Sequence, residues 1–176
     1  MAEMTADDAR GLLQIYLGTL KNESRLTKRV LEAVPAPRSD YRPDPVSKSA
    51  IELVRHIAAA EPRFLNVVTT GEFSTQGGIP ETAKTPAEIA AWYDEQFTRA
   101  FDGLTRATTE QLLKTVNFRG MFEKPAVTFL IMGLHHTIHH RGQLSSYLRS
   151  MGAKVPSIYG ESYDDAGSRK TAQSSG

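Results

Sequence analysis

The chain has 176 residues, 40% of them hydrophobic and 23% charged, which suits a single globular domain with a core of its own. Its 21 Lys and Arg residues nearly balance 20 Asp and Glu residues, and the formal net charge of +1 comes without a basic block. We therefore expect neither a nucleic-acid partner nor binding to an anionic membrane surface. The absence of cysteine excludes disulfides, thiolate catalysis by the chain itself, and cysteine-ligated zinc or iron–sulfur sites.

The N-terminal residues and the hydropathy of the chain are those of a soluble protein. Residues 1–10 carry Glu3, Asp7 and Asp8 without an apolar run, so they do not resemble a signal peptide. No stretch approaches the roughly 20 apolar residues of a membrane span. We therefore expect a cytoplasmic protein without a membrane partner, an expectation that the lack of cysteine also fits.

Two helices are expected in the first half of the chain. The first should begin near Thr5, with acidic residues in its first turn, and should end at the proline-rich residues 35–45. Ser49 and Glu52 have the spacing of a capping box and open the second helix. Pro62 lies within this second helix and predicts a kink, because proline cannot donate a backbone hydrogen bond.

The second half of the chain contains the two remaining helices. After a polar loop over residues 71–84, Thr-Pro-Ala-Glu at residues 85–88 combines an N-cap, a first-position proline and a capping-box acid. Residues 108–115 favour one or two further helical turns, and residues 116–122 favour an extended crossing or a short hairpin. The fourth helix should cover about residues 125–151, with a glycine placed to end it.

These elements describe an all-α protein, a four-helix bundle with one long crossing connection. We expect a single domain over residues 1–163, followed by a disordered polar tail over residues 164–176. No internal repeat is visible in the sequence.

Four of the 5 histidines lie close together on the predicted fourth helix. His135 and His139 are four residues apart, as are His136 and His140, so each pair shares one face of the helix. Two imidazoles one turn apart can converge on a metal ion, and His56 on the second helix can add a third ligand. A site of this kind leaves a coordination position for water or substrate, which is typical of catalytic metal centres.

Other metal chemistries fit the sequence less well. The motif His-Glu-x-x-His is absent, which excludes a zincin protease, and the absence of Glu-x-x-His argues against a di-iron carboxylate bundle. Histidines on facing helices can also ligate haem, although the chain has no cysteine for covalent attachment. The alternative to a ligand role is a cluster of histidines on a plain solvated surface.

The fourth helix has apolar residues on two of its sides. His136 and His140 lie on one of these sides, whereas His135 and His139 fall between the two apolar stripes. A helix that is apolar on two sides indicates burial against the bundle and also against a second subunit. We therefore expect a homodimer, although periodicity does not decide which face holds the metal.

Several segments together resemble a known family. The matching segments are residues 41–43, 52–58, 71–73, 136–144, 147–149 and 155–160. On these residues, which are spread over roughly residues 5–165, the chain resembles the DinB family. Its members are damage-inducible four-helix proteins, distinct from the DNA polymerase that shares the name.

The resemblance implies a four-helix bundle of the DinB/YfiT type, usually dimeric, with one divalent metal ion on three histidines. Carried over residue by residue, the metal ligands are His56, His136 and His140, and His135 and His139 are neighbours rather than ligands. Zinc or nickel is the expected metal, with iron or manganese as alternatives.

Through related thiol S-transferases and thiol-dependent isomerases, the resemblance also implies a reaction. A metal-bound low-molecular-weight thiol would act as the nucleophile on a small-molecule substrate, or metal-bound water would act in a related hydrolysis. The alternative is a non-catalytic, metal-binding homodimer that acts as a stress-response or interaction protein. A polar group and an open pocket at the metal favour the enzyme, whereas a metal sealed by apolar side chains favours the alternative.

Glu61 is the candidate catalytic residue outside the histidines, because it falls on the apolar stripe of the second helix. A buried carboxylate there would be a general base or would orient a ligand histidine. The alternative is an ion pair with Arg55, Arg63 or a lysine at the edge of the bundle.

Three residues that follow the histidines belong to the resemblance without an assigned chemistry. Arg141 is expected to pair with a buried acid, and Gln143 is expected to serve helix packing or an interface. Gly142 is expected to allow close approach of a neighbouring helix. Tyr93 and Phe97 lie on an aromatic stripe of the third helix, which either lines a substrate pocket or forms core.

Overall fold

Four long helices form the body of the protein in the computed structural model, which describes residues 4–75 and 78–174. The long helices are α1 (Ala6–Glu32), α2 (Ala50–Thr70), α3 (Pro86–Thr105) and α5 (Thr128–Ser150). The shorter elements are the 3-10 helix η1 (Ala36–Arg38), α4 (Thr109–Leu113), the strands β1 (Thr115–Phe118) and β2 (Phe122–Pro125), and α6 (Tyr163–Ser174). The expected all-α fold is thereby confirmed.

The starts of three long helices follow from their local sequences. In each of them the N-cap hydroxyl accepts a backbone N–H, and the acid three residues later accepts the N–H of the N-cap. The reciprocal pairs are Thr5 with Asp8, Ser49 with Glu52, and Thr85 with Glu88. α2 continues through Pro62 as one helix. Gly152, just beyond α5, has a φ of 70°, the left-handed conformation expected where a helix ends.

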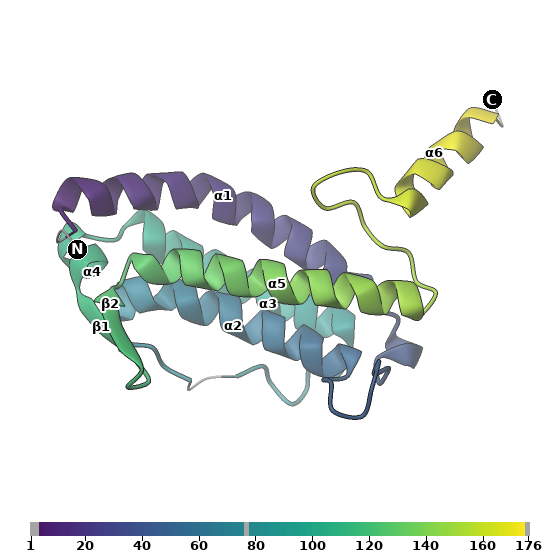
Figure 1. Ribbon diagram of the computed structural model, residues 1–176, viewed down its shortest axis with the longest axis horizontal. Helices are drawn as coiled ribbons and strands as arrows, with labels where there is room; N and C mark the ends of the chain where they lie inside the picture. The colour runs from purple at the N-terminus through teal and green to yellow at the C-terminus, as the bar shows by residue number, and fades with distance from the viewer. Residues whose placement is uncertain (1–3, 76–77, 175–176) are drawn as a thin grey trace.

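Figure 1 shows the long helices side by side, with α4 and the two strands at one end of the bundle. α1 packs against α3 and α5, and α2 packs against the same two helices, so the four form a ring. α2 and α3 run in the same direction, opposite to α1 and α5 (Figure 1). The chain must therefore return along the bundle between α2 and α3. The connection between α2 and α3 does so, which supplies the one long crossing connection that the fold prediction included without assigning its residues.

The segment between α3 and α5 contains a hairpin rather than an extended crossing. β1 and β2 pair in antiparallel fashion, with Val116 opposite Lys124. Arg119 and Gly120 at its tip have φ values of 56° and 77°, the left-handed values that reverse a strand tightly. The helical turns expected over residues 108–115 are present as α4.

α2 and α5 approach each other closely at Gly133. A Cβ atom added to this glycine would lie 2.5 Å from the Cβ of Phe64, so only glycine permits the observed spacing of the two backbones. The same role expected for Gly142 is wrong, because a Cβ added there would meet no atom within 4 Å. Both glycines lie on α5, and only the neighbouring helix distinguishes them.

The polar segment expected to be a disordered tail over residues 164–176 is helical in α6, and residues 175–176 lie outside the described part. Asp164 links its first turn to the rest of the chain. The carboxylate of Asp164 pairs with Arg149 at 2.8 Å and accepts the backbone N–H of Val155 at 2.9 Å. Beyond this anchor α6 projects away from the bundle (Figure 1), which explains how a helix can have so few apolar residues.

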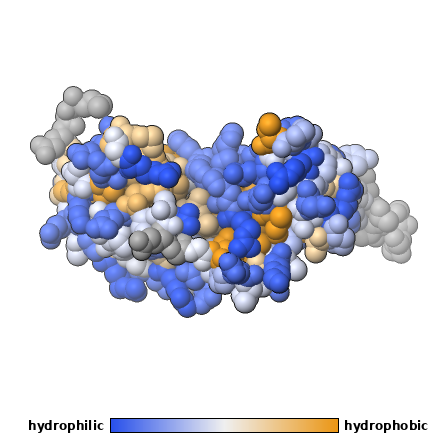
Figure 2. All heavy atoms as spheres, turned by 90° about the horizontal axis from the view of Figure 1, so that it is seen from below, coloured by the Kyte–Doolittle hydropathy of each residue, from blue (hydrophilic) through white to orange (hydrophobic). Residues whose placement is uncertain are grey.

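One outer face of the bundle is largely polar. Figure 2 shows the face seen from below in Figure 1, where hydrophilic side chains dominate and hydrophobic areas are small and separate. Within residues 4–75 and 78–174, no helix has both the length and the apolar character needed to cross a membrane.

Candidate metal centre

Three histidines from two helices converge at one point of the bundle. His136 and His140 lie one turn apart on α5, and His56 reaches them from α2. The Nε2 atom of His56 lies 2.9 Å from Nε2 of His136 and 3.1 Å from Nε2 of His140. Each side chain therefore offers one ring nitrogen to a common centre, and these atoms all lie within 4.8 Å of one another.

The other two histidines do not take part in this cluster. His135 and His139 are exposed on α5. The ring of His139 contacts the edge of the His140 ring, with 4.8 Å between the centroids. The structure thus brings together the three residues that the family resemblance named as ligands and leaves the other two beside them.

The environment of the three rings favours their neutral form. Burial lowers the pKa of both His56 and His136 to about 4, and the positive charge of neighbouring histidines adds to the effect. Burial also lowers the pKa of His140. At neutral pH the rings are therefore unprotonated on one nitrogen, which is the state required of a metal ligand.

The spacing of the three nitrogens fits a metal ion. Zinc–nitrogen bonds of about 2.0–2.1 Å at tetrahedral angles put ligand nitrogens roughly 3.4 Å apart. The observed separations of 2.9 and 3.1 Å differ from this by only a few tenths of an ångström. The three rings are half-buried rather than sealed in the core.

The second nitrogens of these rings have different surroundings. Nδ1 of His140 lies 3.1 Å from the Oε1 atom of Gln143 on the same helix. Nδ1 of His136 is buried and has no hydrogen-bond partner among the described residues. Hydrogen bonds of this kind set the tautomer and the orientation of a ligand imidazole, so His140 is held more firmly than His136.

Glu61 lies in the core of the bundle and has a tyrosine as its partner. The hydroxyl of Tyr93 on α3 donates to its Oε2 atom at 2.5 Å, whereas the Oε1 atom is buried without a hydrogen-bond partner among the described residues. Burial raises the pKa of Glu61 to about 7. Of the partners expected for an ion pair with Glu61, Arg55 donates instead to the backbone carbonyls of Ile79 and Ala83. In the described part of the chain no hydrogen bond joins Glu61 to a histidine of the cluster.

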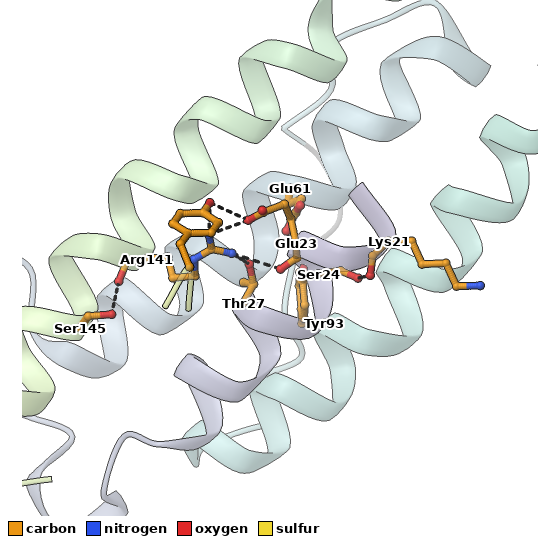
Figure 3. A network of polar contacts seen from close by, with 9 residues as sticks. Lys21, Glu23, Ser24, Thr27, Glu61, Tyr93, Arg141 and Ser145 are labelled. Carbon is orange, nitrogen blue, oxygen red and sulfur yellow. Dashed lines mark hydrogen bonds and ion pairs between the residues drawn. The ribbon is translucent and has the colours of Figure 1, made fainter. Parts of the chain in front are cut away.

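Arg141 pairs with a buried acid, as expected from the sequence, and the acid is Glu23 of α1 (Figure 3). Its guanidinium lies 2.6 Å from the Glu23 carboxylate and also donates to the hydroxyl of Thr27 at 3.2 Å. Tyr159, from the segment after α5, accepts from Arg141 and donates to Glu23 at 2.9 Å. This network ties α1, α5 and the C-terminal segment together, and it explains Arg141 through packing rather than chemistry at the histidines.

Fold and site together define a four-helix bundle protein with a three-histidine cluster shared by its second and last long helices. The chain belongs to the DinB family, whose match covers residues 9–172. It is 30% identical over 129 residues to the Bacillus subtilis (strain 168) protein YjoA. The aligned residues cover 72% of this chain and 82% of YjoA.

Solved structures show the same fold. The crystal structure of the DinB-like protein YjoA from Bacillus subtilis matches with a TM-score of 0.68 and 24% identity, over 83% of this chain and 97% of that one. A DinB-like protein from Bacillus cereus matches with a TM-score of 0.67 and 24% identity, over 82% of this chain and 95% of that one. At this identity the two likenesses show the fold alone.

Proposed function

We propose that this DinB-family protein is a cytoplasmic, metal-dependent enzyme that holds one divalent ion on His56, His136 and His140. The convergence of three Nε2 atoms from α2 and α5 is the observation that carries the proposal. Ligands of this type suit zinc or nickel, with iron or manganese as alternatives. The reaction is the transfer of a small thiol to a small-molecule electrophile, or a related hydrolysis.

The residues around the site support an anionic nucleophile. A bound divalent ion lowers the pKa of a coordinated thiol or water, which makes a nucleophile available near neutral pH. The three histidines contribute no charge when they are neutral. Lys48 and Arg63 place positive charge near His56, which contributes to lowering the pKa of that histidine. The same positive charge stabilises a thiolate or hydroxide held beside His56.

A second candidate is a non-catalytic metal-binding protein that acts in a stress response or as an interaction partner. It is favoured by Glu61, because the carboxylate is bonded to Tyr93 in the core and is not linked to the histidine cluster. That arrangement leaves the site without an assigned general base. The three histidine ligands favour the enzyme, since a purely structural metal normally has four protein ligands and no open coordination position.

Elemental analysis of the untagged protein by mass spectrometry tests the metal site. We expect about one equivalent of zinc, nickel or iron in the native protein and its loss in the double variant His136→Ala/His140→Ala. The double variant His135→Ala/His139→Ala is the matched control, since it removes two exposed histidines from the same helix, and it should keep the metal. Absence of metal from the native protein after reconstitution with each ion would overturn the proposal.

If metal is found, a screen of low-molecular-weight thiols against small electrophiles separates the two candidates. Turnover that depends on both the thiol and the metal supports the enzyme. Full metal occupancy with neither thiol transfer nor hydrolysis of the substrates tested supports the non-catalytic protein.

A further inference from the structure

A chain of polar atoms leads from His140 to the beginning of α2. Nδ1 of His140 lies 3.1 Å from Oε1 of Gln143, and the amide nitrogen of Gln143 lies 3.4 Å from the hydroxyl of Tyr147. The Tyr147 hydroxyl in turn lies 3.2 Å from the backbone carbonyl of Lys48. Lys48 directly precedes Ser49, the N-cap of the helix that carries His56.

The direction of every hydrogen bond in this chain follows from its last member. A backbone carbonyl can only accept, so the Tyr147 hydroxyl donates its single hydrogen to the carbonyl of Lys48. Toward Gln143 the same hydroxyl must then accept, which requires the NH2 group of the amide on that side. The Oε1 atom is thereby turned to His140 and can only accept. Nδ1 of His140 must therefore carry the hydrogen.

The positions of these three side chains hold the hydrogen-bonded series in one arrangement. His140, Gln143 and Tyr147 are spaced by three and four residues on α5, so they lie on one face of the helix. Tyr147 is buried, and its ring packs edge-on against Tyr41 with 5.6 Å between centroids. The hydroxyl is fixed by this packing and cannot follow a rotating amide.

We infer that Gln143 and Tyr147 are positioning residues that hold His140 in the Nδ1–H tautomer, with the lone pair of Nε2 directed at the metal position. The inference rests on the proposed metal centre for its functional meaning, but the tautomer itself is a property of the metal-free protein. His136 lacks such a partner in the described part of the chain, so the support is specific to one ligand. Outer partners of this kind set both the orientation and the basicity of a ligand imidazole.

Long-range nitrogen–proton NMR of the metal-free protein at pH 7.5 reads the tautomer directly. In the native protein His140 should show a protonated Nδ1 and an unprotonated Nε2. The variant Gln143→Leu removes the acceptor and should release His140 into a mixture of tautomers. Gln143→Glu keeps an acceptor at this position and should retain the native tautomer. A native His140 protonated on Nε2 would overturn the inference.

Metal affinity gives the second readout, measured by competition with a chromophoric chelator for zinc. Gln143→Leu should bind about 10–100-fold more weakly than the native protein, whereas Gln143→Glu should stay close to it. Ser146→Ala is the matched control, because this hydroxyl lies on the exposed side of α5 and bonds back to the Gly142 carbonyl. Equal affinity of Gln143→Leu and native protein would overturn the inference.

Tyr147→Phe keeps the ring and removes only the hydroxyl, so it tests the series of hydrogen bonds from Lys48 to His140 if Gln143→Leu fails to fold. The amide should then be free to turn, with a partial loss of the tautomer and a smaller loss of affinity. If Tyr147→Phe keeps the full native tautomer, Gln143 alone positions His140, and the inferred role of Tyr147 is overturned. If the native protein binds no metal, the proposed function fails, while the NMR measurement still decides the present inference.

Discussion

Two carboxyl groups lie in the core of the bundle and meet opposite conditions. Glu23 faces the guanidinium of Arg141 at 2.6 Å, so its charge is paired. Glu61 faces the neutral hydroxyl of Tyr93, and burial raises its pKa to about 7 from an ordinary value of 4.5. Removal of one partner of a buried ion pair lowers the free energy of unfolding by roughly 3–5 kcal/mol. An unpaired buried carboxyl destabilises the fold by itself once it ionises.

Replacing Glu61 by Gln should flatten part of the pH dependence of stability. Between pH 4.5 and about 7 the folded protein keeps a proton on Glu61 that the unfolded chain has lost, so the free energy of unfolding falls as pH rises through this window. At 1.36 kcal/mol per pH unit the loss amounts to about 3 kcal/mol. Glu61→Gln should therefore match the native protein near pH 4 and be more stable at pH 8.

Urea unfolding of the metal-free protein from pH 4 to pH 8 measures this difference. Glu110→Gln serves as the control, since Glu110 is exposed on the short helix α4 and should leave the profile unchanged. A Glu61→Gln profile parallel to the native one would show that folding does not raise the pKa of Glu61, so that the carboxyl is ionised at neutral pH. Such a carboxylate would be a candidate base once more.

At the residue scale the sequence was informative wherever chemistry and spacing coincide. The pair His136 and His140 follows from helical periodicity and metal-ligand chemistry, but the choice over His135 and His139 needed the family resemblance. The partners of Arg141 and Glu61 were beyond prediction, because they come from α1 and α3 and depend on how the helices are rotated in the bundle. Tyr147 carried a usable signal, since it lies seven residues after His140 on the same face.

Two glycines of α5, Gly133 and Gly142, differ in how closely a neighbouring helix approaches them. Gly133→Ala puts a methyl group 2.5 Å from Phe64, so α2 and α5 must separate, and we expect a loss of about 1–3 kcal/mol in unfolding free energy. Metal affinity should fall as well, because Phe64 also contacts the ring of His136, with 5.7 Å between centroids. Gly142→Ala meets open space and should stabilise the helix by up to about 1 kcal/mol.

Chemical denaturation and zinc competition on the two alanine variants provide the measurement. Equal stability of both variants would mean that α2 and α5 do not approach at Gly133 as described. From the sequence alone, the close approach is expected at Gly142 instead. A single sequence shows that a glycine is present, whereas the atom it would meet belongs to another helix.

Helix starts behaved differently from helix contacts. Capping boxes are written in four consecutive residues, so the beginnings of α1, α2 and α3 were predicted from the sequence. The segment of α6 was expected to be disordered because it is polar. Its first turn is held by Asp164 and Arg149, which are 15 residues apart and whose pairing composition does not reveal.

The proposed homodimer is a property of the whole molecule. Ile131 and Ile138 are seven residues apart on one face of α5, and both stay partly exposed in the single chain. We predict that light scattering gives twice the chain mass of 19.4 kDa. Ile138→Glu should shift the mass toward the single chain, because a charge on an apolar interface is costly to bury.

Val46→Glu is the control for this experiment, since Val46 is 96% exposed in the connection between α1 and α2 and should not affect assembly. A native mass of one chain at every concentration would contradict the homodimer. The apolar second side of α5 was visible in the sequence, but which surface covers it depends on a partner that periodicity does not identify.

The separation of the ligands along the chain also orders events during synthesis. His56 and His136 are 80 residues apart, and His140 follows on the last long helix. At about 5–20 residues per second, His136 is added roughly 4–16 s after His56. Until His135 is added, one residue before His136, the nascent chain offers a single imidazole, so the three-histidine site for the proposed ion is complete only when the last long helix has been made.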